Sequence, residues 1–264
     1  MLLLWIILCA AFGGIASAAF AVVFLWVPEE RSARILPHFI SFATGALLGA
    51  ALLALLPEAM AGAGPSGAHD IGLVLVVGLG VFFVIEKLVL WWHAHSQEDE
   101  KGAAQHAHHH DHGRDRASGV LVLVGDSIHN ALDGVLIAAA FLSDLSLGVV
   151  TTFAVAAHEI PHRVGDFAIL VHAGLSRRRA VLLNLATGIA SVIGAIAAYL
   201  GLRRAIGVLP FALAFAAAGF LYIAVAGLIP GLHRRSDPRT SAAQVLLISL
   251  GIVVIALAER LTHR

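Results

Sequence analysis

Four polar side chains in one long apolar stretch share a single helical face. They occupy positions i, i+3, i+4 and i+7 of the stretch and are Asp126, His129, Asn130 and Asp133. Residues at this spacing lie on one side of an α-helix. Carboxylates and neutral imidazoles are ligands for divalent metal ions, so this face can contribute to a metal site.

A second polar cluster follows in the next apolar stretch, in the segment His158-Glu159-Ile160-Pro161-His162-Arg163-Val164-Gly165-Asp166. Its two histidines and Asp166 lie one helical turn apart, and Glu159 and Arg163 form a second pair at i, i+4. Pro161 has no N–H group, which leaves the carbonyl of Ala157 without its usual helical partner. The segment therefore combines metal-binding side chains with an interrupted backbone ladder.

Two helices that carry these clusters can together supply the four nitrogen and oxygen donors of a tetrahedral divalent-metal site. Further donors nearby would allow a higher coordination number. The alternative is a buried network in which the polar groups only satisfy one another. Nine ionisable or amide groups on two helices favour the metal site over that alternative.

The composition places these helices in a membrane. Of the 264 residues, 59% are hydrophobic and 13% are charged, whereas soluble domains have about 25% charged residues. Ionisable residues inside membrane spans are costly and face a cavity or one another, so both clusters are functional candidates. The balanced charge, with 17 basic and 17 acidic residues, argues against a nucleic-acid binder. The single cysteine excludes a disulfide framework and a cysteine-rich zinc site.

Eight apolar segments are long enough to cross a bilayer, for which a helix needs about 20 residues. They span roughly residues 2–26, 39–62, 72–92, 118–142, 147–174, 180–202, 208–232 and 241–259. The sequence therefore predicts an all-α polytopic membrane protein with eight transmembrane helices in one domain, residues 1–264. Eleven basic residues lie in the connections after odd-numbered spans, and four lie on the other side. The positive-inside rule then places both termini outward, in the periplasm.

The connection between the third and fourth spans, residues 93–117, is polar and rich in histidine. Its densest histidines are His106, His108, His109, His110 and His112. Such a tract cannot form a packed core, and it is typical of a disordered metal-binding segment. We interpret it as a cytoplasmic loop that binds metal loosely, as a buffer or sensor. A solvated loop without a metal role is the alternative.

The two clusters resemble motifs of the ZIP family of zinc–iron permeases. The resemblance lies in His129-Asn130-x-x-Asp133-Gly134 followed by His158-Glu159-Ile160-Pro161-His162. The run Gly165-Asp166-Phe167-Ala168-Ile169-Leu170 is similar to the segment that follows this motif in the histidine-rich branch of the family. Eight spans, outward termini and a histidine-rich third connection extend the resemblance, to bacterial-type members, over most of the chain.

The resemblance implies a divalent metal held between the fourth and fifth spans, often at two adjacent sites, and moved into the cytoplasm. The first site would use His129, Asp133, His158 and His162. The second would use Asn130, Glu159 and shared ligands such as Asp133 and His162. Zn²⁺ is the expected substrate, and Fe²⁺, Mn²⁺ and Cd²⁺ also suit mixed nitrogen and oxygen ligands. Asp126, Arg163 and Asp166 would support the ligands or take part in gating.

Arg163 departs from the family pattern, because the histidine-rich branch usually has a second glutamate at this position. Our hypothesis is that Arg163 pairs with Glu159 or Asp166 and takes the electrostatic role of the second metal. One transport site would then remain. The alternative is that Arg163 impairs transport and leaves a metal-binding membrane sensor.

The segment from His158 to His162 also matches H-E-x-x-H, a signature of zinc metalloproteases. Intramembrane proteases carry this motif before a Leu-Asp-Gly segment, whereas Leu132-Asp133-Gly134 precedes it here, and Pro161 interrupts the motif. The sequence therefore predicts a transporter and not an enzyme, importing metal across a bacterial inner membrane. Its partners are divalent metal ions and the lipid bilayer, with no nucleic acid, and a homodimer is left open.

Overall fold

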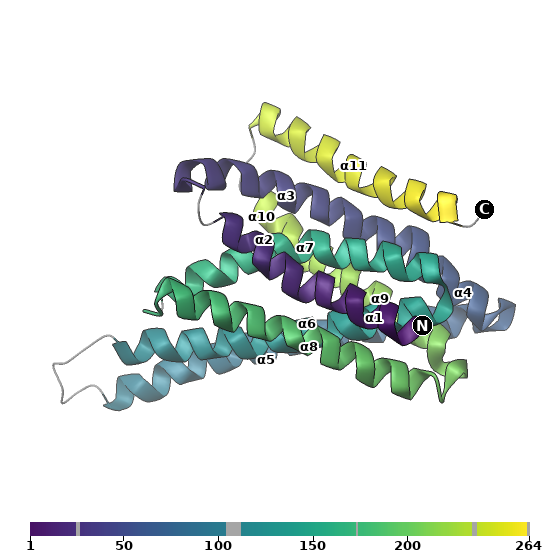
Figure 1. The fold of residues 1–264 in the computed structure, drawn as a ribbon, viewed down its shortest axis with the longest axis horizontal. Coiled ribbons are helices and arrows are strands. Elements are labelled where there is room, and N and C mark those ends of the chain that lie inside the picture. The colour runs from purple at the N-terminus through teal and green to yellow at the C-terminus, as the bar shows by residue number, and fades with distance from the viewer. Residues whose placement is uncertain (25–26, 104–111, 173, 234–236, 263–264) are drawn as a thin grey trace.

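The chain is an elongated bundle of helices. The computed structural model describes residues 1–24, 27–103, 112–172, 174–233 and 237–262, and within these ranges it contains helices and no strand. The helices lie alongside one another, and Met1 and the end of the last helix lie toward the same end of the bundle (Figure 1). An all-helical architecture is what the apolar segments predict.

The elements follow one another with short connections. In chain order they are α1 (Leu2–Ala11), η1 (Phe12–Ala16), α2 (Ser17–Phe24), α3 (Glu29–Gly49), η2 (Ala50–Leu55), α4 (Leu56–Ala63), η3 (Pro65–Gly67), α5 (Ala68–Ala103), α6 (His112–Ser143), α7 (Leu145–His172), α8 (Arg177–Leu202), η5 (Ile206–Val208), α9 (Leu209–Tyr222), η6 (Ile223–Leu228), α10 (Ile229–His233) and α11 (Pro238–Thr262). Three of them, η1, η2 and η6, are π-helical turns inside longer helices.

Two of the π-helical turns come directly before a proline. η2 ends two residues before Pro57, and η6 ends two residues before Pro230. A proline ring clashes with the carbonyl four residues earlier and has no N–H to donate. A wider π turn accommodates that clash without ending the helix. The helices therefore continue through both prolines, and α3 to α4 and α9 to α10 each form one long span.

Among the described residues, six helices are long and apolar enough to cross a membrane. They run over Leu2–Phe20, Arg34–Ala63, Pro65–Leu88, Arg177–Leu202, Ile206–His233 and Pro238–Leu261. These six correspond to predicted spans, and the protein is a multi-pass membrane protein. Of the other two predicted spans, 118–142 lies within α6, and 147–174 begins within α7, which ends at His172. Over their described residues, α6 and α7 do not meet the same measure of length and apolarity.

Glycines bring α6 and α8 into backbone contact. A methyl group added at Gly134 would lie 1.8 Å from the carbonyl oxygen of Ser191, and one added at Gly194 would lie 2.1 Å from that of Ala131. Atoms cannot approach so closely, so only glycine fits at either position. Small residues allow this close packing of membrane helices. The contact fixes α6 against α8 beside Asp133.

The helices α6 and α7 run antiparallel and are joined by a tight turn at Asp144. The backbone N–H of Ser146 donates to Oδ1 of Asp144 at 2.8 Å, which caps the start of α7. α7 then continues through Pro161 to His172. Because the two helices are antiparallel, the start of α6 and the end of α7 lie together at the end of the bundle opposite the termini (Figure 1).

Helix covers part of the segment 93–117 that the sequence predicts to be a disordered loop. α5 continues to Ala103, and α6 begins at His112. Four of the predicted loop ligands, His106, His108, His109 and His110, lie outside the described residues. The proposed metal role of this loop therefore stays a prediction.

Candidate metal centre

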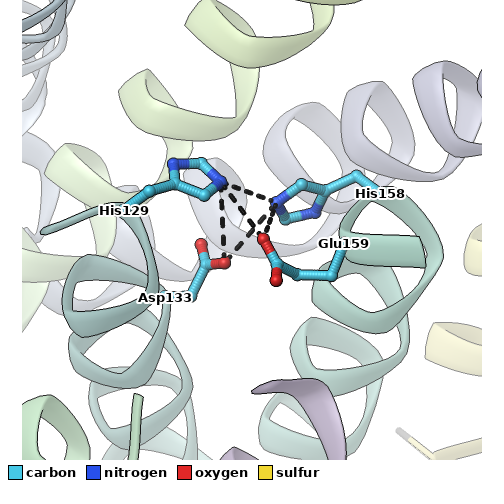
Figure 2. Close-up of side chains that lie close together, drawn as sticks. All are labelled: His129, Asp133, His158 and Glu159. Carbon is cyan, nitrogen blue, oxygen red and sulfur yellow. Dashed lines mark hydrogen bonds and ion pairs between the residues drawn. The ribbon is translucent and has the colours of Figure 1, made fainter. Parts of the chain in front are cut away.

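Two imidazoles and two carboxylates converge between α6 and α7. His129 and Asp133 project from α6, one turn apart, and His158 and Glu159 project from the facing side of α7 (Figure 2). We call these four residues site A. They are the first of two groups in the described part of the chain whose ligand atoms lie within 4.8 Å of one another.

The distances within site A are those of ligands around one small cation. The two histidine Nε2 atoms lie 3.2 Å apart. Nε2 of His129 lies 3.5 Å from Oε1 of Glu159 and 3.8 Å from Oδ2 of Asp133. Nε2 of His158 lies 3.5 Å from Oδ2 of Asp133 and 3.9 Å from Oε1 of Glu159. Tetrahedral Zn²⁺ with bonds of about 2.0–2.1 Å separates its ligand atoms by about 3.3 Å.

Two carboxylate oxygens of site A are buried without a hydrogen bond. Oδ2 of Asp133 and Oε1 of Glu159 accept none from any residue that the structure describes. Buried polar groups are nearly always satisfied, so each exception needs an explanation. Both oxygens point into the space that the two imidazoles also face (Figure 2). A bound cation would satisfy both of them at once.

The backbone sets the orientation of one ligand. Nδ1 of His158 lies 3.1 Å from the carbonyl oxygen of Ala154, one turn earlier on α7. A carbonyl only accepts, so Nδ1 carries the proton and Nε2 keeps its lone pair for site A. Metal-binding histidines are commonly held in this way by a partner on the other ring nitrogen.

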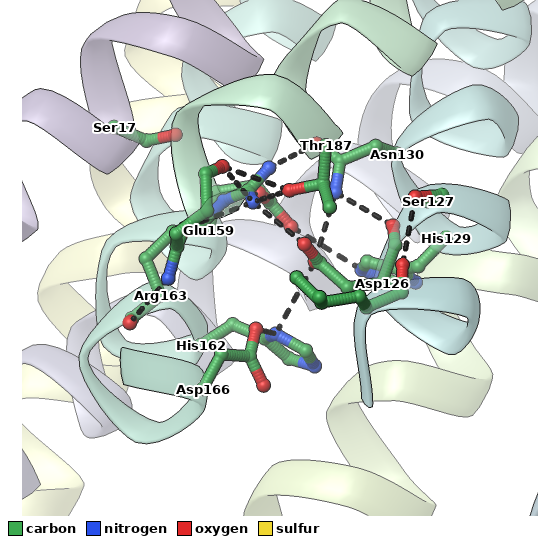
Figure 3. A network of polar contacts seen from close by, with 12 residues as sticks. Ser17, Asp126, Ser127, His129, Asn130, Glu159, His162, Arg163, Asp166 and Thr187 are labelled. Atoms are coloured by element: carbon green, nitrogen blue, oxygen red, sulfur yellow. Dashed lines mark hydrogen bonds and ion pairs between the residues drawn. The ribbon is translucent and has the colours of Figure 1, made fainter. Parts of the chain in front are cut away.

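Beside site A, a fully buried arginine occupies the rest of the cluster. Arg163 donates from Nε to Oε2 of Glu159 at 2.8 Å and from Nη1 to Oδ2 of Asp126 at 2.7 Å (Figure 3). The pairing with Glu159 that the sequence analysis expects is therefore present. Nη2 donates to Oδ1 of Asn130. Arg163, on α7, thus links its helix to α6 through the carboxylate of Asp126 and the amide of Asn130, and pairs with Glu159 within α7.

Two residues of α8 complete the arginine's surroundings, and neither was predicted from the sequence. Nη1 of Arg163 donates to the backbone oxygen of Asn184 at 2.9 Å, to its Oδ1 at 3.0 Å, and to the hydroxyl of Thr187. The available signal was their spacing, since they are polar residues at i, i+3 inside an otherwise apolar span. They bring a third helix into the cluster.

A second group of potential ligands lies beside site A. Nδ1 of His162 lies 2.9 Å from Oδ2 of Asp166 and 4.0 Å from Oδ1 of Asp126. These three residues form the other group whose ligand atoms lie within 4.8 Å of one another. The ring of His162 stacks on that of His129, with centroids 5.2 Å apart and planes inclined by 14°.

The grouping of the ligands in the structure differs from the grouping that the family resemblance implies. Glu159, and not His162, completes the group around His129, Asp133 and His158. Asn130 faces away from site A, because its Nδ2 donates to the backbone oxygen of Asp126 at 2.7 Å and to its Oδ1 at 2.9 Å. The three residues expected to support or gate the site, Asp126, Arg163 and Asp166, all lie in the same polar cluster (Figure 3).

The cluster has an excess of negative charge. It contains four buried carboxylates, those of Asp126, Asp133, Glu159 and Asp166, and one buried guanidinium, that of Arg163. With neutral imidazoles the formal charge is therefore −3. Uncompensated buried charge is costly. The balance favours the entry of a divalent cation and disfavours any anion.

The fold and this cluster define a polytopic helical membrane protein with a candidate metal centre in its bundle. The model of the family described as ZIP zinc transporter matches residues 2–259, and the chain belongs to that family.

Named relatives agree with the family match. The chain is 38% identical over 245 residues to the zinc transporter ZIP13 of Pongo abelii, covering 87% of this chain and 68% of that protein. It is 32% identical over 344 residues to the zinc transporter SLC39A7 of Rattus norvegicus, covering 98% and 73%. It is 35% identical over 267 residues to ZIP13 of Homo sapiens, covering 87% and 72%.

Family membership decides between the transporter and protease interpretations of the segment from His158 to His162. ZIP proteins are transporters, so the chain is not an enzyme, and its H-E-x-x-H match is not a protease signature. The family also establishes divalent metal ions as the class of substrate.

Proposed function

We propose that the protein imports Zn²⁺ into the cytoplasm through site A, between α6 and α7. The observation that carries the proposal is the convergence of two histidine Nε2 atoms and two unsatisfied, buried carboxylate oxygens. Nitrogen and oxygen ligands without a thiolate hold Zn²⁺ in exchangeable form. Transport requires this exchange, because a cation bound too tightly is not released. Fe²⁺, Mn²⁺ and Cd²⁺ are competing substrates to be tested.

The proposed topology has eight spans with both termini outside the cytoplasm, in a bacterial inner membrane. α6 and α7 have 32 and 28 residues, enough to cross a bilayer beside the six apolar spans. The ends of α2, α5, α7 and α10 gather opposite the termini (Figure 1), as an eight-pass arrangement requires. Eleven of the basic residues belong in the sequence to the connections after odd-numbered spans, which the positive-inside rule assigns to the cytoplasm.

The proposed stoichiometry is one tightly bound metal per chain. Arg163 already contacts Oε2 of Glu159, Oδ2 of Asp126 and Oδ1 of Asn130. A second cation that used these oxygens would have to displace a guanidinium with six hydrogen-bond acceptors. We infer that Arg163 supplies the positive charge of a second metal and leaves site A as the single tight site.

The second candidate function is metal sensing without transport. Arg163 connects α6, α7 and α8 through buried hydrogen bonds, and such a bridge could prevent the helix movements that transport needs. The two candidates differ in one observable quantity, because a sensor binds metal but carries no flux.

Uptake of Zn²⁺ by purified protein in liposomes tests the proposal. The wild type should accumulate Zn²⁺, and His158→Ala should lose both uptake and tight binding. Asp70→Asn is a matched control, because Asp70 is an exposed carboxylate in the first turn of α5, outside the cluster. Tight Zn²⁺ binding by a wild type that shows no flux would favour the sensor.

A further inference from the structure

We propose that Asp126, His162 and Asp166 form a second, weaker cation site that receives Zn²⁺ from site A before its release. We call these three residues site B. This proposal rests on the proposed function, since it gives the next step of the cation after site A. Neither the family match nor the names of the relatives describe such a site.

The geometry of site B suits a cation with two carboxylates and one imidazole. Its three ligand atoms lie within 4.8 Å of one another. Nδ1 of His162 shares a proton with Oδ2 of Asp166 at 2.9 Å. An arriving Zn²⁺ would take the place of that proton, which would leave to the adjoining water as metal binding releases it. Oδ1 of Asp126, at 4.0 Å from Nδ1, is the third ligand, and a cation would compete there with the hydrogen bond from Nδ2 of Asn130 at 2.9 Å.

Site B lies between site A and one end of the bundle. Asp126 is nearer the start of α6 than Asp133 is, and Asp166 is nearer the end of α7 than His158 is. These two helix ends lie together, opposite the termini (Figure 1). With a rise of 1.5 Å per residue, the two sites are about 8 Å apart along the helix axes. In the proposed topology this direction leads to the cytoplasm.

Among the residues of the two sites the exposed fraction is largest at His162, whereas Asp126 and Asp166 are buried, with side chains 2% and 11% exposed. The side chains of Asp133, His158 and Glu159 are buried, that of His129 is 21% exposed and that of His162 is 41% exposed. The stacked rings of His129 and His162 join the two sites. A cation that moves from site A to site B therefore passes along two adjacent imidazoles and gains access to water.

Site B is the weaker of the two, because the oxygens that it offers already accept hydrogen bonds: Oδ1 of Asp126 accepts from Asn130, and Oδ2 of Asp166 from His162. Within the described residues, the two facing oxygens of site A accept none. Arg163 pairs with Oδ2 of Asp126 and with Oε2 of Glu159, so the same guanidinium contacts both sites. Site B has three ligands against four in site A. Weak binding at site B would let Zn²⁺ dissociate quickly, as release from the protein requires.

Two Zn²⁺ measurements on the full-length protein test site B. In liposome uptake, Asp166→Asn should lower the maximal rate about tenfold, with tight Zn²⁺ binding unchanged, whereas His158→Ala should remove both. In detergent, His158→Ala should keep one weak Zn²⁺ equivalent, and the double variant His158→Ala/Asp166→Asn should lose it. His158→Gln replaces His158→Ala if that variant does not fold, and Asp70→Asn serves as the exposed carboxylate control.

The outcomes separate the two proposals. If the wild type carries no flux, or His158→Ala transports normally, the proposed function is wrong. If wild type and His158→Ala behave as expected but Asp166→Asn transports at the wild-type rate, site B is wrong and site A stands. Retention of the weak equivalent in the double variant would also overturn site B.

Discussion

Glu159 separates two halves of one polar cluster that differ in how their oxygens are satisfied. Its Oε2 accepts from Nε of Arg163 at 2.8 Å, in a half where the guanidinium has acceptors on α6, α7 and α8. Its Oε1 lies on the other side, in site A, and accepts no hydrogen bond within the described residues. Oδ2 of Asp133, also in site A, likewise accepts no hydrogen bond from the described residues.

The difference indicates which half is built for an exchangeable cation. The arginine half carries its own fixed charge and fixes α8 against α6 and α7. Site A has negative oxygens and imidazole lone pairs but no fixed cation, which leaves a place for a mobile one. Glu159 thus belongs to both halves: its Oε2 binds the structural arginine, and its Oε1 faces the proposed transport site.

The largest expected effect is on site A. Asp133→Asn removes an oxygen that faces the two imidazoles and has no contact with Arg163. Losing an outer-shell partner costs about 10–100-fold in metal affinity, and a direct ligand should cost at least as much. We expect Zn²⁺ affinity and uptake to fall by about 100-fold or more, measured by indicator competition and liposome flux. Unchanged affinity would show that site A is wrongly assigned.

The next effect is on stability, in the arginine half. Arg163→Ala leaves the carboxylates of Glu159 and Asp126 buried and unpaired, which costs about 3–5 kcal/mol. The melting temperature without metal should fall accordingly. Zn²⁺ should restore much of the loss, because a cation that binds only the folded state stabilises it. A variant that melts like the wild type, or gains nothing from Zn²⁺, would contradict the role given to Arg163.

Acid should weaken transport. His129 and His158 bind a cation through Nε2 only while that nitrogen carries no proton. Protons therefore compete with Zn²⁺ increasingly as the pH falls, and uptake should decrease by up to about tenfold per pH unit for each competing proton. Initial rates at constant free Zn²⁺ measure the effect. A steep rise in uptake on acidification would contradict the ligand assignment.

The smallest effect is expected from one acceptor of the arginine. Thr187→Val removes the hydroxyl that accepts from Nη1 of Arg163, while Asn184 and Asp126 still contact that nitrogen. Stability should fall by about 1 kcal/mol with little change in Zn²⁺ uptake. Thr44→Val is the matched control, because the hydroxyl of Thr44 donates to its own helix at 2.8 Å. A large loss of uptake in Thr187→Val would show that the contacts of Arg163 also control transport, which contradicts the separation of the two halves.

Much of the fold could be predicted because apolar length is a strong signal. Six of the eight predicted spans are helices that meet the requirement for crossing a membrane. α6 and α7, which carry the polar cluster, do not meet that measure over their described residues. The tight contact of α6 with α8 could not be read from the pattern, since it depends on Gly134 meeting the backbone at Ser191.

The residues of the candidate site could be predicted from the sequence, but which of them group together in site A could not. Helical spacing brings Asp126, His129, Asn130 and Asp133 to one face, and all four take part in the cluster. Spacing cannot decide whether Glu159 or His162 joins His158 in site A. The outcome depends on side-chain rotamers and on the other hydrogen-bond partners of each side chain. Here Asp166 holds His162, and Arg163 holds one oxygen of Glu159.

The number of tightly bound Zn²⁺ ions per chain tests whether site A is the single tight site and Arg163 replaces a second metal. Purified wild type and Arg163→Glu can be compared by metal analysis after equilibration with Zn²⁺ and removal of weakly bound metal. We expect one tight equivalent in the wild type, lost in Asp133→Asn, and a second in Arg163→Glu, where a carboxylate replaces the fixed charge. Two tight equivalents in the wild type, both dependent on Glu159, would contradict this expectation.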